Sequence, residues 1–162
     1  MKTLHLIRHA KSEWEKEDQR DIDRTLNNRG HEACKVMAHR IVSAGCHFDN
    51  VFCSPAVRAQ QTIEGITATL LPKEVKWEVD YDLYTFDSAE LLDWLDRLPD
   101  RIDEVVVVGH NPAITELNNL LGDKHLDNVP TCGYVQMQLD IKTWNEIAAN
   151  CGQLQEYLTP KD

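Results

Sequence analysis

A run of four consecutive valines, Val105–Val108, constrains the fold more than any other feature of the sequence. Four β-branched residues in a row suit a strand that is buried on both faces, and such strands belong to parallel sheets covered by helices. The rest of the chain alternates short apolar runs with longer segments of helical periodicity, which is typical of α/β proteins. We therefore expect a three-layer α/β/α fold with a mostly parallel central sheet, formed as a single domain over residues 1–162.

The individual elements are predicted from periodicity and from the residues that begin and end helices. Strands are predicted at Thr3–Ile7, Val51–Cys53, Val75–Val79 and Val105–Val108, with two closing strands at Tyr134–Leu139 and Thr143–Ala148. Helices are predicted at Arg29–Ala44, Pro55–Leu71, Ser88–Leu98 and Pro112–Leu121. The charged segment from Ala10 to Asn28 follows neither pattern, and a loop of that length in a compact domain is usually functional or mobile.

Charge and hydropathy exclude several classes of partner. The net charge is −10, so the phosphates of nucleic acids and anionic membrane surfaces would be repelled. No apolar run reaches the length that spans a bilayer, and the first residues lack a secretory pattern. Five cysteines without a C-x-x-C pair indicate reduced thiols. We therefore expect a cytoplasmic protein. We also expect a monomer, because no exposed apolar helix indicates an interface.

Polar residues gather where three of the predicted strands end. In chain order these residues are Arg8, His9, Ser54, Pro55, Arg58, His110, Asn111 and Pro112. In an open parallel sheet, ligands bind outside the carboxyl ends of the strands. We therefore expect these side chains to line one pocket.

The types of residue at these strand ends favour a phosphate ligand. Ser54 and Asn111 are predicted N-caps, and Pro55 and Pro112 are predicted first residues of the helices that follow. Helix N-termini offer free N–H groups and a partial positive charge to an anion. The two arginines add forked donors that match phosphate oxygens in pairs.

The two histidines of the pocket point to covalent phosphoryl transfer. A neutral imidazole nitrogen is a nucleophile towards phosphorus, and a carbonyl near the end of the first strand could hold His9 in one tautomer. Arg8, Arg58 and a protonated His110 would stabilise the transferring oxygens. Water would then release phosphate from His9, so this chemistry requires no metal and no cofactor.

The segment Leu6-Ile-Arg-His-Ala-Lys-Ser12 resembles the signature of the histidine phosphatase superfamily, which includes the phosphoglycerate mutases. Ala10 and Lys11 resemble its small phosphohistidine phosphatase branch, the SixA type. Further segments resemble motifs of this branch in the same order: Asp23–Gly30, Ser54–Thr62, Val107–Pro112, Val129–Gly133 and the terminal Trp144.

The resemblance implies a phosphoglycerate mutase-like fold and a role for each matching residue. It makes His9 the phosphorylated nucleophile, with Arg8, Arg58 and His110 around the phosphate. Ser12 and Asn111 would be further contacts to the phosphate or to the loops of the site.

The sequence departs from the mutase-like pattern in two places. Trp14 is followed by Glu15, where mutase-like members have an asparagine. Those members also carry a glutamate general acid after the second helix. The corresponding stretch here has none and leaves three candidates, Asp82, Tyr84 and Asp87. A leaving nitrogen is protonated more readily than an alkoxide, so a missing acid favours phosphohistidine as the substrate.

We therefore expect a phosphohistidine phosphatase that acts on a phosphorelay or carrier protein. One alternative is a broad phosphomonoesterase that uses the same His9 chemistry on small phosphorylated molecules. Another is a non-catalytic module that binds a phosphorylated ligand. A hydrolase that uses metal-bound histidines is disfavoured, because no two histidines have the i, i+4 spacing with an intervening glutamate that marks a zinc helix.

Overall fold

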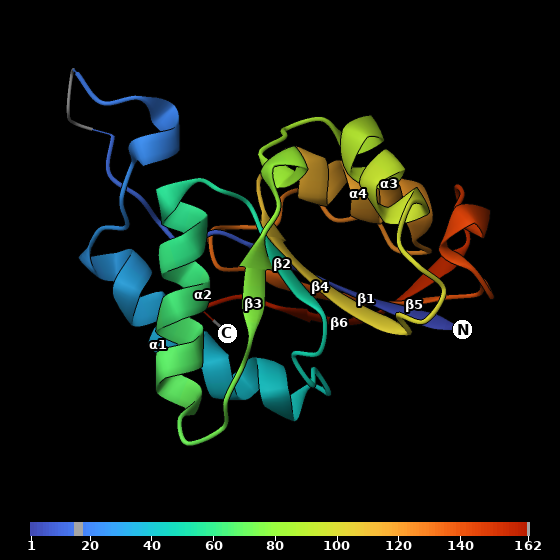
Figure 1. Ribbon diagram of the computed structural model, residues 1–162, viewed down its shortest axis with the longest axis horizontal. Helices are drawn as coiled ribbons and strands as arrows, with labels where there is room; N and C mark the ends of the chain where they lie inside the picture. Colours follow the sequence, from blue (N-terminus) through green and yellow to red (C-terminus); the bar gives the residue numbers. More distant parts are fainter. Residues whose placement is uncertain (15–17, 162) are drawn as a thin grey trace.

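The computed structural model describes residues 1–14 and 18–161. A six-stranded sheet runs through the middle of the described chain, with the strand order β3-β2-β4-β1-β5-β6 (Figure 1). The strands are β1 (Lys2–Arg8), β2 (Val51–Cys53), β3 (Trp77–Val79), β4 (Glu104–Gly109), β5 (Tyr134–Leu139) and β6 (Gly152–Leu158). The first four strands pair in parallel, and β5 and β6 are antiparallel, which confirms the mostly parallel sheet.

Helices cover both faces of the sheet. One face carries α1 (Asn28–Ser43) and α2 (Val57–Leu70), and the other carries α3 (Ser88–Asp96) and α4 (Ala113–Leu121) (Figure 1). Three short 3-10 helices connect these elements: η1 (Asp21–Asp23), η2 (Tyr81–Leu83) and η3 (Trp144–Glu146). The expected three-layer α/β/α architecture is confirmed. None of the helices among the described residues is long and apolar enough to cross a membrane.

The valine run explains why the sheet sits between two cores. Val105 and Val107 belong to the core under α3 and α4, whereas Val106 and Val108 belong to the core under α1 and α2. Successive side chains of a strand point to opposite faces, so a central strand needs an apolar residue at every position. The strand β4 lies between β1 and β2 and is buried on both faces as expected.

The predicted closing strand at Thr143–Ala148 is wrong. Thr143 and Glu146 form a capping box instead, which starts the helix η3. This turn buries Trp144, whose Nε1 donates to the carbonyl oxygen of Ile102 at 2.8 Å. The sixth strand is β6, at the sheet edge, where mixed polar and apolar residues and an irregular register with β5 weaken the strand pattern.

Candidate active site

The carboxyl ends of β1, β2 and β4 lie side by side, because β4 pairs in parallel with both neighbours. His9 follows β1, Ser54 follows β2, and His110 follows β4. The centroids of the His9 and His110 rings are 5.3 Å apart. The sheet thus brings together, at one edge, the polar strand ends that the sequence singled out.

One hydrogen bond fixes the tautomer of His9. Its Nδ1 lies 2.8 Å from the carbonyl oxygen of Ala10, which can only accept, so Nδ1 carries the proton. The other nitrogen, Nε2, therefore holds a lone pair and lies 3.4 Å from Nε of Arg58. Burial, with a smaller effect from the positive charges of Arg58 and Arg8, lowers the pKa of His9 to about 4.

His110 is held in the opposite tautomer. Its Nδ1 accepts from Nη2 of Arg58 at 3.4 Å, so its Nε2 donates to Oγ of Ser54 at 2.7 Å. Burial, with smaller effects from His9 and Arg58, lowers the pKa of His110 to about 3. The burial and positive surroundings of His110 thus favour its neutral form in the protein without a bound anion, and its protonation beside a phosphoryl group stays a prediction.

Arg58 links the two histidines to the loop before α1. It lies on the first turn of α2 and is only 2% exposed. Besides the two imidazoles, its Nη1 donates to the backbone carbonyl of Asp21 at 2.6 Å, and its Nη2 donates to the carboxylate of Asp21 at 3.0 Å. A single guanidinium thus faces the nucleophilic nitrogen of His9 and the free nitrogen of His110.

Arg8 supplies a second guanidinium with spare donors. Its Nη1 donates to the carbonyl oxygen of Val129 at 2.9 Å. Its Nε is buried and has no hydrogen-bond partner among the described residues. A buried donor without a partner is costly unless a ligand satisfies it, so Arg8 is suited to an anion.

Asp21 and Arg24 are functional candidates that the sequence reasoning missed. The carboxylate of Asp21 accepts from Tyr84 Oη at 2.6 Å, from Arg24 Nη1 at 2.9 Å and from Arg58. Partial burial raises the pKa of Asp21, but these hydrogen bonds outweigh it and hold the pKa well below its usual range. The one signal for this pair was the long charged segment from Ala10 to Asn28.

The side chains of Ser12 and Asn111 line the site, but both are already hydrogen-bonded to neighbouring residues of the protein. Oγ of Ser12 accepts from Nη2 of Arg24. The amide nitrogen of Asn111 donates to the carbonyl of Val129 at 2.9 Å, and its oxygen accepts from the backbone N–H of Thr115 at 3.1 Å. Both residues border the cavity, so a contact of either with phosphate stays a prediction.

Two of the predicted helix starts, those of the helices that follow β2 and β4, are slightly early. The helix α2 begins at Val57 rather than Pro55, and α4 begins at Ala113 rather than Pro112. The hydroxyl of Ser54 accepts from the backbone N–H of Ala56 at 3.2 Å, but its main partner is His110. Ser54 is therefore a partner of an active-site imidazole more than a helix cap.

Most of these groups line a cavity of about 450 Å³, whereas His110, Ser54 and Tyr84 lie behind its wall and are not among the lining residues. Its wall contains His9 and the three guanidiniums of Arg8, Arg24 and Arg58. The exposed aromatic rings of Trp14 and Phe86 line it as well, and the guanidinium of Arg24 lies 3.5 Å from the centroid of the Trp14 ring. The side chain of Trp14 is 79% exposed.

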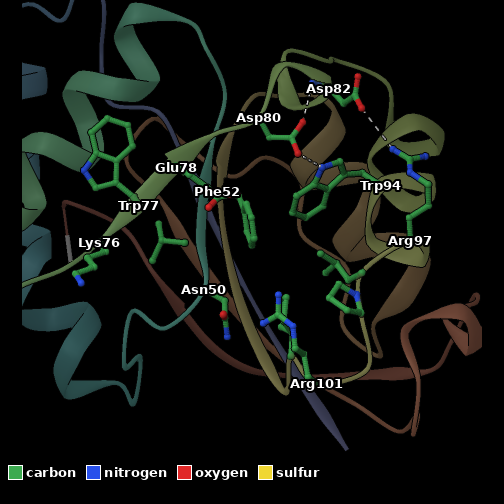
Figure 2. Close-up of a pocket in the computed structure, with 14 residues that line it drawn as sticks. Asn50, Phe52, Lys76, Trp77, Glu78, Asp80, Asp82, Trp94, Arg97 and Arg101 are labelled. Atoms are coloured by element: carbon green, nitrogen blue, oxygen red, sulfur yellow. Dashed lines mark hydrogen bonds and ion pairs between the residues drawn. The ribbon is translucent and has the colours of Figure 1, made fainter.

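Of the three candidate general acids, only Tyr84 reaches the site, where its ring centroid is 5.5 Å from that of His110. Asp82 pairs instead with Arg97 at 3.6 Å, beside a separate cavity of about 660 Å³ between the sheet edge and α3 (Figure 2). Asp87 accepts from the backbone N–H of Ala89 and caps α3. Glu15 lies outside the described residues.

A sequence profile of the histidine phosphatase superfamily (branch 1) matches residues 4–90, more than half of the chain. The chain belongs to this superfamily. At that level it is a phosphatase, a hydrolase that acts on phosphoryl bonds. Solved structures of SixA proteins have the same fold as this chain. A SixA structure from Nakamurella multipartitia superposes with a TM-score of 0.81 at 23% identity, covering 99% of this chain and 97% of that one.

Other relatives span both phosphatases and mutases of the superfamily. A protein histidine phosphatase SixA complexed with tungstate has a TM-score of 0.79 at 22% identity, over 98% of this chain and 97% of that one. An uncharacterised protein from Picosynechococcus is 32% identical over 115 residues, which cover 70% of this chain and 68% of the relative. A 2,3-bisphosphoglycerate-dependent phosphoglycerate mutase from Mesorhizobium japonicum is 32% identical over 94 residues, 56% of this chain but only 45% of the mutase.

Proposed function

We propose that this histidine phosphatase hydrolyses a protein phosphohistidine through a covalent phosphoryl intermediate on Nε2 of His9. The observation that carries the proposal is the tautomer of His9. The Ala10 carbonyl accepts a hydrogen bond from Nδ1–H, which leaves the Nε2 lone pair facing the guanidinium of Arg58. A neutral nucleophile beside fixed cationic donors is the arrangement that phosphoryl transfer needs.

In the first step, the lone pair of His9 Nε2 forms a bond to phosphorus while the N–P bond to the substrate breaks. The leaving imidazole nitrogen takes up a proton. Arg58 and Arg8 would bind the equatorial oxygens, whose charge they stabilise most strongly in the transition state. The negative charge of a bound phosphoryl group would favour the protonated form of His110, which would then donate a hydrogen bond to the transferring group.

In the second step, water attacks phosphorus, His9 Nε2 leaves with its electron pair, and the proton that water loses passes to solvent. The same guanidiniums would hold the phosphoryl group in both steps. Tungstate is a tetrahedral oxyanion like phosphate, and a SixA of the same fold was solved in complex with it, which supports an oxyanion as the ligand.

The acidic group of the site explains the preference for a nitrogen leaving group. Asp21 is the one carboxylic acid among the described residues that line the cavity. Its pKa lies well below the usual range, so it is ionised at neutral pH and cannot act as a general acid. An alkoxide leaves poorly without an acid, whereas an imidazole nitrogen can be protonated from solvent.

A substrate panel tests the choice of substrate. We expect kcat/KM for a phosphohistidine-bearing carrier protein to exceed that for sugar phosphates and for p-nitrophenyl phosphate by more than about hundredfold, equivalent to about 2.7 kcal/mol of transition-state stabilisation. The His9→Ala variant is the control for each substrate. Faster cleavage of a sugar phosphate than of the phosphohistidine protein would overturn the proposal.

A phosphomonoesterase acting on small molecules is the second candidate. It is favoured by the match to a phosphoglycerate mutase, a protein named for a small phosphorylated substrate. The same panel separates the two functions. A third possibility, a module that only binds phosphorylated ligands, predicts phosphate binding without any turnover of the panel.

A further inference from the structure

A second group of metal-ligand side chains lies towards the opposite end of the sheet from His9. His5 is in the middle of β1, Glu104 begins β4, and Cys46 follows α1. One ligand atom of each residue lies within 4.8 Å of the others. His5 and Cys46 are 0% and 2% exposed. Four residues of strand separate His5 from His9, or about 13 Å, so this cluster is distinct from the active site.

A fourth ligand atom reaches the cluster from the solvent side. Nδ1 of His47 lies 3.0 Å from Oε2 of Glu104, and the backbone N–H of His47 donates to Oε1 at 3.3 Å. The side chain of His47 is 72% exposed. The cluster therefore combines the buried His5 and Cys46 and the partly buried Glu104 with the exposed His47, which an ion arriving from solvent would contact first.

The loop that carries Cys46 and His47 is held in place by its backbone. Gly45 ends α1 with φ +105°, which a residue with a Cβ rarely adopts. The backbone N–H of Cys46 donates to the carbonyl of Ile41 at 3.3 Å. Four residues further on, the amide of Asn50 donates to the carbonyl of Glu104 at 3.1 Å. The loop is thus tied to α1 at one end and to the start of β4 at the other.

His5 also has a hydrogen-bond partner at the ring nitrogen that faces away from the cluster, as metal-bound histidines usually have. Its Nδ1 lies 2.6 Å from the hydroxyl of Tyr134, and its Nε2 lies 2.6 Å from Oε1 of Glu104. When Nδ1–H donates to the Tyr134 oxygen, Nε2 presents its lone pair to the cluster. A hydrogen bond at the far ring nitrogen orients a ligating imidazole and fixes its tautomer.

We propose that His5, Cys46, His47 and Glu104 form a binding site for a divalent transition metal ion, and that Zn²⁺ is the ion they suit best. Two imidazoles, a thiolate and a carboxylate match the ligand preference of Zn²⁺. Zinc bonds of about 2.0–2.3 Å put tetrahedral ligand atoms roughly 3.3–3.6 Å apart, so His5 and Glu104 would separate by less than about 1 Å. His47 contacts Glu104 and would have to turn towards the ion to become the fourth protein ligand, which would close the coordination sphere as in a structural site.

Metal binding would change the protonation of the cluster. A bound metal releases the thiol proton of Cys46 to solvent and replaces the hydrogen bond between His5 and Glu104. The ion would join β1, β4 and the loop after α1 at the end of the sheet that lies away from the active site.

Cobalt spectroscopy tests the site directly. Untagged full-length protein is stripped with a chelator, dialysed, and titrated with Co²⁺ and then Zn²⁺. We expect one equivalent of Co²⁺ to give the visible bands of tetrahedral cobalt and a thiolate-to-cobalt charge-transfer band in the near ultraviolet. Zn²⁺ should displace the cobalt and raise the melting temperature.

Two variants identify the ligands. Cys46→Ser should remove the charge-transfer band, and His47→Gln, at an exposed position that folding tolerates, should weaken Zn²⁺ binding by more than about tenfold. Cys151→Ser and His39→Gln are the matched controls and should bind as the parent does. The absence of stoichiometric binding would show a hydrogen-bonded His5–Glu104 pair without a metal and would overturn the proposal. A band that survives Cys46→Ser, or full affinity in His47→Gln, would do the same.

Discussion

At the scale of single residues, a backbone carbonyl decides which nitrogen of His9 can attack phosphorus. The oxygen of Ala10 accepts from Nδ1 at 2.8 Å, and a carbonyl has no proton to exchange. The unprotonated nitrogen is therefore Nε2, on the side of Arg58, and it is the nucleophile in the mechanism that we propose. His110 is fixed in the opposite sense by Ser54, so both imidazoles present an unprotonated nitrogen to Arg58.

The low pKa values of these two imidazoles predict an acid-tolerant enzyme. The pKa is about 4 for His9 and about 3 for His110, and a histidine is protonated only below its pKa. We therefore expect kcat/KM, corrected for the titration of the substrate, to stay level from pH 8 to about pH 5 and to fall near pH 4. A pH–rate profile measures this. A fall in kcat/KM near pH 6.5, the pKa of an exposed histidine, would contradict the lowering of these pKa values by burial.

The carboxylate of Asp21 competes with an anion for Arg58 and Arg24. In the Asp21→Asn variant the amide keeps the size of the side chain but loses the negative charge. We expect inorganic phosphate to bind about tenfold more tightly, because a repulsive charge is removed from the cavity, while kcat falls because Arg58 is less firmly placed. Competitive inhibition by phosphate gives the binding constant.

Asp23→Asn is the matched control, since Asp23 pairs with the exposed Arg20 rather than with the pocket. It should leave phosphate inhibition unchanged. Weaker phosphate binding in Asp21→Asn would show that Asp21 serves mainly to position Arg58.

The residues of the pocket divide into those that sequence could predict and those that it could not. His9 and His110 stand at the ends of recognisable strands, so their meeting follows from the parallel sheet. Asp21 gives no such signal. It reaches Arg58 across 37 positions of sequence from a segment without periodicity, and only the folded loop brings the two together.

At the scale of elements, the loop after β1 depends on the close approach of α1. A Cβ at Gly30 would clash with the backbone carbonyl of Lys11, whose oxygen accepts from the backbone N–H of Asn27 at 3.0 Å. The first turn of α1 thus lies directly on the backbone that follows the nucleophile. A glycine in a helix is otherwise unfavourable, so the close approach explains its presence.

The Gly30→Ala substitution should therefore displace the residues that follow His9. We expect unfolding free energy to fall by about 1–3 kcal/mol, as for other overpacked positions, and kcat/KM to fall by more than about tenfold. Denaturant unfolding and steady-state kinetics measure the two effects.

Gly65→Ala is the control within the neighbouring helix α2. A Cβ there would lie 3.0 Å from Cβ of Cys34, a side-chain contact away from the pocket, so catalysis should be unchanged. Equal losses of activity in both variants would mean that disturbing either helix, rather than the contact of residue 30 with Lys11, causes the loss.

The elements of the sheet differ in how clearly the sequence marked them. The valines of β4 are buried on both faces, which leaves an uninterrupted apolar run. The edge strand β6 alternates poorly, because only one neighbour constrains it and its register with β5 shifts at Gln136 and Met137. The apolar residues of Thr143–Ala148 produce a strand-like sequence pattern, although they belong to a capped 3-10 turn.

At the scale of the whole molecule, two cores hold the sheet while the pocket lies at its carboxyl edge. Trp144 is fully buried in the core under α3 and α4 and donates to Ile102. We expect Trp144→Ala to lower the unfolding free energy by about 3–5 kcal/mol, as is usual for a buried tryptophan. Below its lowered melting temperature the variant should retain kcat/KM, because the cavity contains no atom of Trp144.

Tyr81→Ala, at a side chain that is 77% exposed, provides the comparison and should change stability by no more than about 0.5 kcal/mol. Thermal and denaturant unfolding of the two variants measure the difference. A loss below about 1 kcal/mol for Trp144→Ala would mean that this core contributes little to the fold.

The central claim is that the assembled sheet makes His9 the phosphoryl acceptor. Rapid mixing with a radiolabelled phosphodonor, followed by a denaturing alkaline quench, preserves an N–P bond and locates the label by peptide mapping. We expect acid-labile label on His9 in the parent protein and in His39→Ala, and no label in His9→Ala. Label that persists in His9→Ala, on any residue, would contradict it.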